Sequence, residues 1–183
     1  MGLSYSGDML LVRQALKGDQ HAFRKIVELN EDRIAKVVIG FLGNTPEAED
    51  VGQEVFIRFF QSMDRYKGDA ALSTYLTRIA INLSLNALKK REKERKSNLD
   101  DVYHTVKSED EHLKKETTDL VTEALQRLEP EFRSVVVLRM IEGFSTKETA
   151  EILKIPAGTV LSRLSRAQKK LKDWFQKEKM ILL

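Results

Sequence analysis

Apolar side chains recur every three or four residues along most of this chain, which is the spacing of one face of an α-helix. Residues 22–42 therefore predict one amphipathic helix, or two joined closely, ended by Gly43-Asn44. A second helix is predicted to run to about Tyr66. Thr45 is its N-cap and Pro46 its first residue, and acidic side chains lie in its first turn, where the helix dipole favours them.

A loop is predicted over Lys67-Gly68-Asp69, and a third long helix follows it from Ser73 to about Lys93. One face of this helix is apolar, and the other is polar. The apolar face carries Leu72, Tyr75, Leu76, Ile79, Ala80, Leu83 and Ala87. The polar face carries Arg78, Asn82, Asn86 and Lys89.

The periodic pattern stops after the third helix. From 97 to 118 the apolar residues are sparse and acidic residues dominate, which predicts a flexible linker. The chain is thus expected to form two small helical domains, over 1–96 and 119–183. The predicted fold class is all-α, because long stretches carry no glycine or proline and no segment reads as a strand.

The second half begins with a helix predicted over 120–128, and Pro130 opens another that ends at Gly143. The side chains expected inside that second helix are Phe132, Val135, Val136, Leu138, Met140 and Ile141. The STKE run that starts at Ser145 is a capping box, which predicts a short helix over 146–153.

That short helix is expected to stop at Lys154-Ile155-Pro156, before a longer basic helix that begins near Ala157. The buried stripe of the longer helix is predicted to contain Val160, Leu164, Ala167, Leu171 and Phe175. A short helix, a tight turn and a long basic helix form a helix-turn-helix, with Ala150, Ile155 and Val160 packing between the helices.

Charge is segregated along the chain, although the formal net charge is only +3. Residues 89–96 hold six basic and two acidic side chains, 97–119 hold seven acidic and three basic, and 154–179 hold eight basic and two acidic. Two basic segments that flank an acidic one suit binding of a polyanion at two places. Charge alone fits solvated helix ends equally well.

In a helix-turn-helix the second helix enters the major groove, and its first turns reach the base edges. Arg166 is the expected guanine reader because a guanidinium donates two hydrogen bonds to one base edge. The residues expected to contact duplex DNA are Thr159, Leu161, Ser162, Arg163, Ser165, Arg166 and Lys169. The alternative is an ordinary helical hairpin with solvated lysines.

The sequence resembles the extracytoplasmic-function sigma factors of bacteria over nearly its whole length. EGFSTKETAEILKIPAGTVLSRLSRAQKKLK looks like the family's C-terminal promoter-reading motif. GNTPEAEDVGQEVFIRFF and LSTYLTRIAINLSLNALKKREK look like its N-terminal motifs for binding core polymerase and melting the promoter. The two blocks in this order are highly specific. Tyr75 stands where relatives usually carry tryptophan, and Lys154 stands where glycine is common.

The resemblance implies a sigma factor, a dissociable specificity subunit that directs RNA polymerase to promoters. It implies that Asp50, Gln53 and Glu54 bind the clamp coiled coil of the core enzyme, and that the C-terminal domain reads the minus thirty-five duplex. It further implies contacts with the polymerase flap and restraint by an anti-sigma factor. The residues expected at the melted minus ten element are Lys67, Gly68, Asp69, Arg78, Asn82, Asn86, Lys89, Lys90 and Arg91.

Three other functional classes lack the sequence features that they need. A conventional helix-turn-helix regulator would need a dimer interface or a ligand pocket in the N-terminal half. A pure interaction protein would leave the basic helix unexplained. An enzyme would need a glycine-rich phosphate loop or clustered metal ligands, whereas His21, His104 and His112 are scattered and the chain has no cysteine. We therefore expect a non-catalytic subunit with no cofactor, metal ion or small-molecule substrate.

The expected location is the cytoplasm, without membrane insertion. The N-terminal residues lack the basic start and apolar stretch of a secretory signal, and no apolar run approaches membrane-spanning length. The absence of cysteine fits a reducing compartment.

Overall fold

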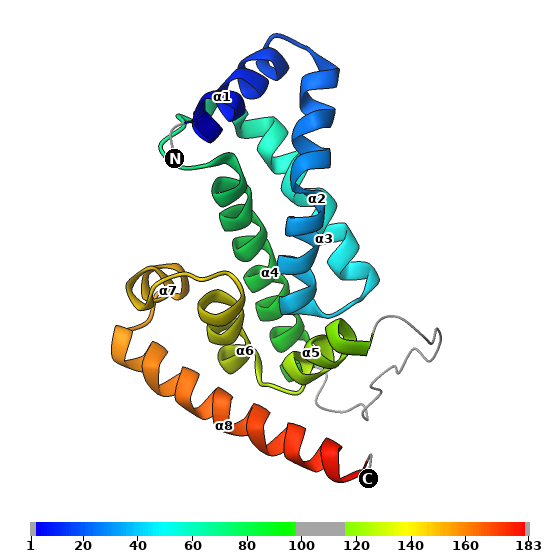
Figure 1. The fold of residues 1–183 in the computed structure, drawn as a ribbon, viewed down its shortest axis with the longest axis vertical. Helices are drawn as coiled ribbons and strands as arrows, with labels where there is room; N and C mark the ends of the chain where they lie inside the picture. Colours follow the sequence, from blue (N-terminus) through cyan, green and yellow to red (C-terminus); the bar gives the residue numbers. More distant parts are fainter. Residues whose placement is uncertain (1–2, 98–115, 182–183) are drawn as a thin grey trace. The chain divides into compact units, whose positions relative to one another are not determined.

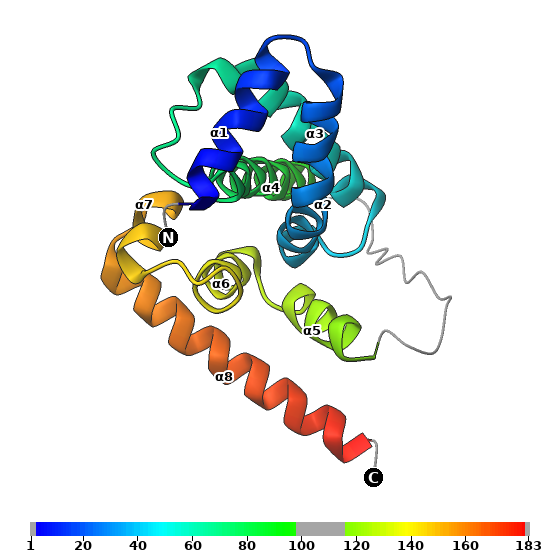
Figure 2. The same cartoon turned by 45° about the horizontal axis from the view of Figure 1, so that its top comes forward.

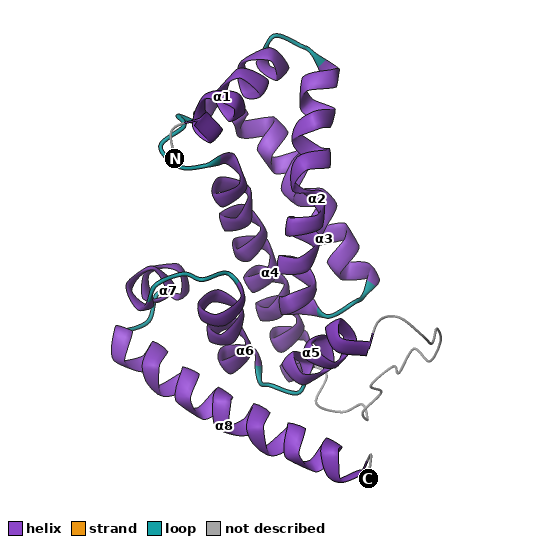
Figure 3. Cartoon of the chain, viewed as in Figure 1, coloured by secondary structure: helices purple, strands orange, loops and turns teal. Residues whose placement is uncertain are grey.

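The computed structural model describes residues 3–97 and 116–181, which are helix or loop with no strand (Figure 3). The chain divides into two compact units, Met1–Asn86 and Ala87–Leu183. The division falls inside the helix α4, Leu72–Ser97. Most of the predicted linker lies outside the described residues, so the expected domain limits stay a prediction.

The first unit contains α1 (Leu3–Leu16), α2 (Gln20–Leu42), α3 (Pro46–Ser62), the short helix η1 (Met63–Arg65) and the start of α4. α1 packs on α2, and α2 packs on α3. α2 and α3 also lie next to α4 (Figures 1 and 2). The three helices predicted for this half of the chain are confirmed, whereas α1 was not predicted.

The ends of α2 and α3 follow from their own sequence. The Asp19 side chain accepts hydrogen bonds from the amides of His21 and Ala22, and so caps α2. Gly43 ends α2 with a φ of 79°, a value that glycine adopts without strain. Thr45 caps α3 by accepting from the Ala48 amide, as its position before Pro46 predicts.

The core of the first unit is mainly apolar, and a polar contact helps to join two of its helices. The Arg33 Nε donates to the Thr77 hydroxyl over 3.2 Å and joins α2 to α4. The fully enclosed apolar side chains include Val12, Ile26, Ile34, Val37, Val38, Phe41, Leu42, Val55, Phe59, Leu76, Ala80 and Ile81. Their burial positions the outward faces of α3 and α4.

The second unit contains α5 (Glu116–Gln126), α6 (Pro130–Val136), the π-helical turn η2 (Val137–Ile141), α7 (Thr146–Leu153) and α8 (Ala157–Ile181). α6, α7 and α5 each pack against the long helix α8. Figures 1 and 2 both show α6 and α7 beside α8. The predicted short helix over 146–153 is confirmed residue for residue.

Two apolar residues predicted to lie inside the helix that starts at Pro130 are exposed. Met140 is 56% and Ile141 is 45% accessible, so their predicted burial is wrong. The reason is η2, in which the Glu142 amide donates to the Val137 carbonyl, one residue further than in an α-helix. The wider turn shifts the side chains at its end out of the α-helical register.

The predicted buried stripe of α8 is correct at its start and wrong at its end. Val160 and Ala167 are fully buried, but Phe175 is 38% exposed. Trp174 takes the inward position instead and is half-buried, in an edge-to-face contact with Phe175 at 4.8 Å.

Among the described helices, none is long and apolar enough to cross a membrane. Within the same residues, no cluster of three or more histidine, cysteine, aspartate or glutamate side chains could hold a metal ion.

Candidate functional site

The helix-turn-helix forms through its capping box and a left-handed turn residue. The Ser145 hydroxyl accepts from the Glu148 amide at 3.2 Å, and the Glu148 carboxylate accepts from the Ser145 amide at 2.8 Å. Lys154 then ends α7 with φ 55° and ψ 46°, the left-handed conformation that glycine adopts more easily. The chain is thereby redirected into α8.

Small and β-branched residues fill the space between α7 and α8. Val160 is fully buried, and Ala150 and Ile155 are half-buried, as the sequence predicts. Thr149 of α7 is also fully buried and was not predicted. This packing holds the first turns of α8 in place.

Most of the residues predicted to contact duplex DNA lie on the exposed side of α8. Ser162, Ser165 and Lys169 follow one another at intervals of three and four, on the side opposite Val160 and Ala167. Arg166 is exposed beside them, and Leu161 is 55% accessible. These side chains form one surface that carries cations, hydroxyls and an apolar group.

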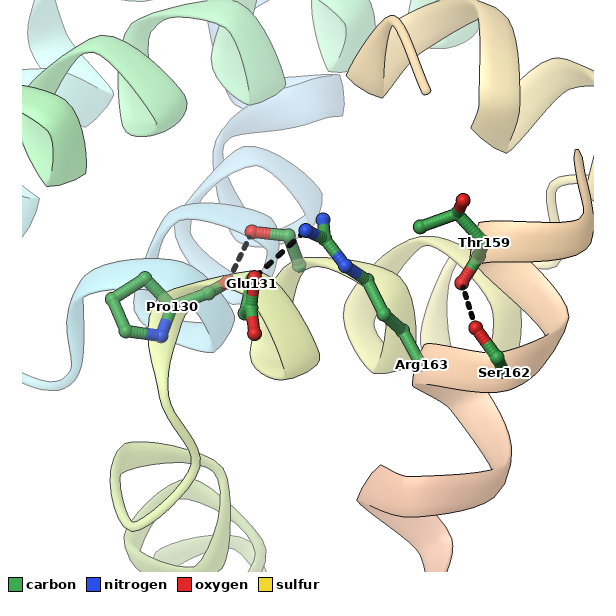
Figure 4. Close-up of polar contacts among 6 residues, drawn as sticks. Pro130, Glu131, Thr159, Ser162 and Arg163 are labelled. Atoms are coloured by element: carbon green, nitrogen blue, oxygen red, sulfur yellow. Dashed lines mark hydrogen bonds and ion pairs between the residues drawn. The ribbon is translucent and has the colours of Figure 1, made fainter. Parts of the chain in front are cut away.

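Arg163 and Thr159 differ from the other predicted contacts. The Arg163 guanidinium donates to the Glu131 carboxylate of α6 over 2.7 Å, and it points toward α6 rather than along the exposed face (Figure 4). Thr159 is half-buried, and its carbonyl accepts from the Ser162 hydroxyl at 3.1 Å. Sequence reasoning could not find the ion pair, because its partners are 32 positions apart.

The α3 residues expected to bind polymerase are partly free. Asp50 and Gln53 are exposed, whereas Glu54 is half-buried and accepts a hydrogen bond from Arg58 at 2.7 Å. Sequence reasoning missed that Ile57, 50% accessible, and Phe60, 55% accessible, lie on the same outward face. The sequence did indicate that these two side chains are exposed, since both fall outside the apolar stripe that forms the core.

A groove of about 250 Å³ runs between α2 and α3 beside this face. Gln53 and Phe56 line it from α3, and Val27 and Ile34 line it from α2. The polar strip on α3 therefore borders apolar surface.

The polar face of α4 is confirmed as exposed. Arg78, Asn82, Asn86 and Lys89 are accessible and recur every three or four residues. Lys90 lies 3.9 Å from Glu94 in an ion pair, and Arg91 is half-buried. At a rise of about 1.5 Å per residue, the predicted contacts from Arg78 to Arg91 extend over ~20 Å. They form a track rather than a compact cluster.

Tyr75, where relatives usually carry tryptophan, is packed into the unit. Its ring lies 6.0 Å from Phe59 and 5.3 Å from Tyr66, both in edge-to-face geometry. The loop before α4 keeps Lys67 and Asp69 exposed and Gly68 half-buried, with a φ of 79° at Gly68.

Comparison with known proteins agrees with this arrangement. The family model for Sigma-70 region 2 matches residues 26–94, and that for Sigma-70, region 4 matches 118–171. The ECF RNA polymerase sigma factor SigW of Bacillus subtilis is 33% identical over 88% of this chain and 92% of its own length. The ECF RNA polymerase sigma-E factor of Escherichia coli K12 is 31% identical over 92% of this chain and 94% of its own length.

Among solved structures, one similar protein is the sigma factor RpoE of Bartonella quintana in complex with the anti-sigma factor NepR. It has a TM-score of 0.65 and 22% identity, and the match covers 84% of this chain and 96% of that one. This similarity supports the fold. The identities over nearly complete lengths, together with the two family models in order, show that the chain belongs to the ECF RNA polymerase sigma factors, which direct promoter-specific initiation of transcription.

Proposed function

We propose that α8 reads the minus thirty-five element as a duplex in the major groove. The observation that carries this proposal is the exposed surface formed by Ser162, Ser165, Arg166 and Lys169, opposite the buried Val160. Arg166 pairs with a guanine, Lys169 and the Thr159 hydroxyl meet phosphate, and Leu161 contacts a thymine methyl group. Arg163 acts mainly by holding α8 against Glu131.

We further propose that α4 and the loop before it hold the melted minus ten strand. Asn82 and Asn86 lie one turn apart and offer both donors and acceptors to unpaired base edges. Arg78, Lys89, Lys90 and Arg91 neutralise backbone phosphates along the helix. The loop residues Lys67, Gly68 and Asp69 border the start of this track.

Core polymerase is proposed to bind the outward face of α3. Asp50, Gln53 and Glu54 meet the clamp coiled coil, and the exposed Ile57 and Phe60 add apolar contact at the border of the polar strip. The flap is proposed to contact the second unit, where Met140 and Ile141 offer exposed apolar surface. The polymerase supplies the chemistry, so this subunit acts without a cofactor in the cytoplasm.

An anti-sigma factor is the proposed regulator. Support comes from the Bartonella quintana sigma factor, whose solved structure is a complex with its anti-sigma factor. An inhibitor of this kind would cover the α3 or α8 surface and prevent polymerase or DNA from binding.

Arg166→Ala tests the proposed role of α8. Loss of a bidentate guanine contact costs about 1 to 3 kcal/mol, so affinity for a minus thirty-five duplex should fall roughly 5- to 150-fold. Affinity for core polymerase should not change. Arg127→Ala is the charge-matched control, since that exposed arginine directly after α5 pairs with Glu123. Loss of core binding, or intact duplex binding, in Arg166→Ala would contradict the assignment.

A double variant of Asp50→Ala with Gln53→Ala tests the proposed role of α3. We expect its affinity for core polymerase to fall by about tenfold or more, with duplex binding retained. Asp32→Ala, an exposed acid of α2, is the control. Unchanged polymerase affinity in the double variant would move the docking surface elsewhere.

A further inference from the structure

Helix α4 lacks a cap from the residue before it. α2, α3 and α7 are each capped by the side chain that directly precedes them, but α4 follows Ala71, whose methyl group accepts no hydrogen bond. The amide of Leu72 donates instead to the Asp8 carboxylate over 3.0 Å. Asp8 belongs to α1 and lies 64 positions earlier in the chain.

The same helix also contacts the loop that leads into α4. A Cβ atom placed on Gly68 would lie 3.0 Å from the Met9 sulfur, so α1 lies directly against the loop backbone. Gly68 also has a φ of 79°, which disfavours any side chain there. α1 therefore meets the loop at its middle and, through Asp8, at its end.

The loop is held from its other side by Tyr66. Its hydroxyl donates to the Ala70 carbonyl over 2.7 Å, and its ring is 5% exposed within the aromatic cluster with Phe59 and Tyr75. Between these fixed points the side chains of Lys67 and Asp69 remain exposed. The backbone is thus restrained while the two charged side chains face outward.

We infer that Asp8 is a positioning residue for recognition of the melted minus ten strand, and that α1 is a working part of the promoter-melting surface. This inference rests on the proposed function of α4 and its loop. α1 lies outside the region 2 match, which begins at residue 26. Asp8 fixes the first turn of α4 and the loop end before the strand arrives, so less conformational freedom is lost on binding.

The test uses holoenzyme assembled from core polymerase and the full-length chain. The probe is the non-template strand of a promoter minus ten element, with 2-aminopurine at one adenine, and its fluorescence reports affinity. Asp8→Ala should weaken strand binding about three- to tenfold, the range expected for loss of a helix cap. Asp8→Asn keeps an acceptor oxygen and should restore affinity to within about twofold of the original.

Two control variants distinguish failure of this inference from failure of the proposed function on which it rests. Asp32→Ala removes an exposed acid from α2 and should leave strand binding unchanged. Asn82→Ala removes a proposed base contact and should weaken it. If Asn82→Ala weakens binding but Asp8→Ala does not, the role of Asp8 is refuted while the minus ten surface stands. If neither variant weakens binding, the proposed minus ten surface fails as well.

If Asp8 had a purely structural role, its replacement would reduce a different set of binding activities. Positioning requires that Asp8→Ala leave the affinities for core polymerase and for the minus thirty-five duplex intact. It also requires faster amide hydrogen exchange confined to residues 67–74. Equal loss of strand binding and core binding would mean general unfolding of the first unit and would overturn the inference.

Discussion

Arg133 is a charged residue buried where α5 ends and α6 begins. Its side chain is 7% exposed, and its guanidinium donates to the carbonyls of Leu125, Gln126 and Leu128 at 2.8 to 3.0 Å. The Gln126 and Leu128 carbonyls lie at the end of α5 and just beyond it, where a helix leaves acceptors for other donors, and the Leu125 carbonyl also accepts from the Leu128 amide at 3.1 Å. Burial lowers the pKa of Arg133 to about 10, so the residue remains cationic at neutral pH.

Replacing Arg133 with methionine should destabilise the second unit. The variant removes the guanidinium donor from three carbonyls, of which only that of Leu125 keeps a second donor, and we expect a loss of about 2 to 4 kcal/mol in the free energy of unfolding, measured with urea. Arg127→Met removes an exposed pair with Glu123 and should cost less than about 1 kcal/mol. Equal effects from the two variants would show that Arg133 does not join the helices.

Replacing the left-handed turn residue Lys154 should stabilise the second unit, in contrast to replacing Arg133. Glycine adopts a φ of 55° without the clash that a Cβ atom causes, although it also raises the entropy of the unfolded chain. Lys154→Gly should therefore stabilise the helix-turn-helix by about 0.5 to 1 kcal/mol in urea unfolding. A lower free energy of unfolding would mean that the lysine side chain makes a stabilising contact of its own.

At the scale of elements, two ion pairs fasten α6 to α8. Arg163 reaches Glu131 at 2.7 Å, and Lys170 reaches Glu129 at 2.6 Å while lying 5.1 Å from the centre of the Phe132 ring. Both acids lie at the start of α6, where the helix dipole favours negative charge. The basic helix is thus oriented by the side chains on one of its faces, and another face is left for DNA.

The Lys170 pair makes the α6–α8 contact sensitive to acid. The hydrogen bond from Lys170 lowers the pKa of Glu129 below its ordinary value of 4.5. Since the folded form binds a proton on the Glu129 carboxylate less tightly than the unfolded chain does, the stabilisation of the folded form by the Lys170–Glu129 pair is present at neutral pH. It decreases below pH 4.5 and is lost as the pH falls through the lowered pKa. Carbon NMR titration of the Glu129 carboxyl measures this value.

Lys170→Met should return the pKa of Glu129 toward its ordinary range. Arg163→Met is the matched control, because Arg163 pairs with Glu131 and should leave the Glu129 titration unchanged. A Glu129 titration that does not respond to Lys170→Met would contradict the assigned pair.

Elements that carry their own start and stop signals were predictable from sequence. Thr45 with Pro46 and Ser145 with Glu148 mark helix ends through contacts only three residues apart. The start of α4 carries no such signal, since its cap comes from Asp8 on a helix that was not predicted. Val12 and Ala15, both buried and three residues apart, were the available sign of α1.

The register of η2 could not be read from the sequence. A π-turn inserts one residue into a continuous apolar run, and periodicity alone does not locate the insertion. The exposed character of the α8 and α4 surfaces did follow from periodicity, because burial of one face decides which side chains face outward. The ion pair between Arg163 and Glu131 could not be predicted from periodicity, since a surface arginine in a basic helix suits DNA and an acidic partner equally well.

For the whole molecule, the near balance of 31 basic and 28 acidic residues hides a local excess of positive charge on α8. Affinity for DNA should fall with rising salt in proportion to the number of phosphates that the chain neutralises. Neighbouring lysines of α8 allow a direct test, because Lys169 is exposed on the proposed DNA face and Lys170 pairs with Glu129.

Lys169→Ala should reduce the slope of log affinity against log salt by about one, as expected for one lost phosphate contact. Lys170→Ala should change the slope much less. Holoenzyme binding to promoter duplex over a salt series measures both slopes. A larger change for Lys170 than for Lys169 would mean that the DNA face of α8 has been assigned to the wrong side.

The most direct measurement is transcription in vitro by purified core polymerase, with and without this chain, on a library of upstream fragments from its own genome. We predict discrete start sites that appear only when the chain is present, with shared sequence at the minus ten and minus thirty-five positions. DNA binding without core binding, and with no new start sites, would contradict the assignment of this chain as a promoter-specificity subunit.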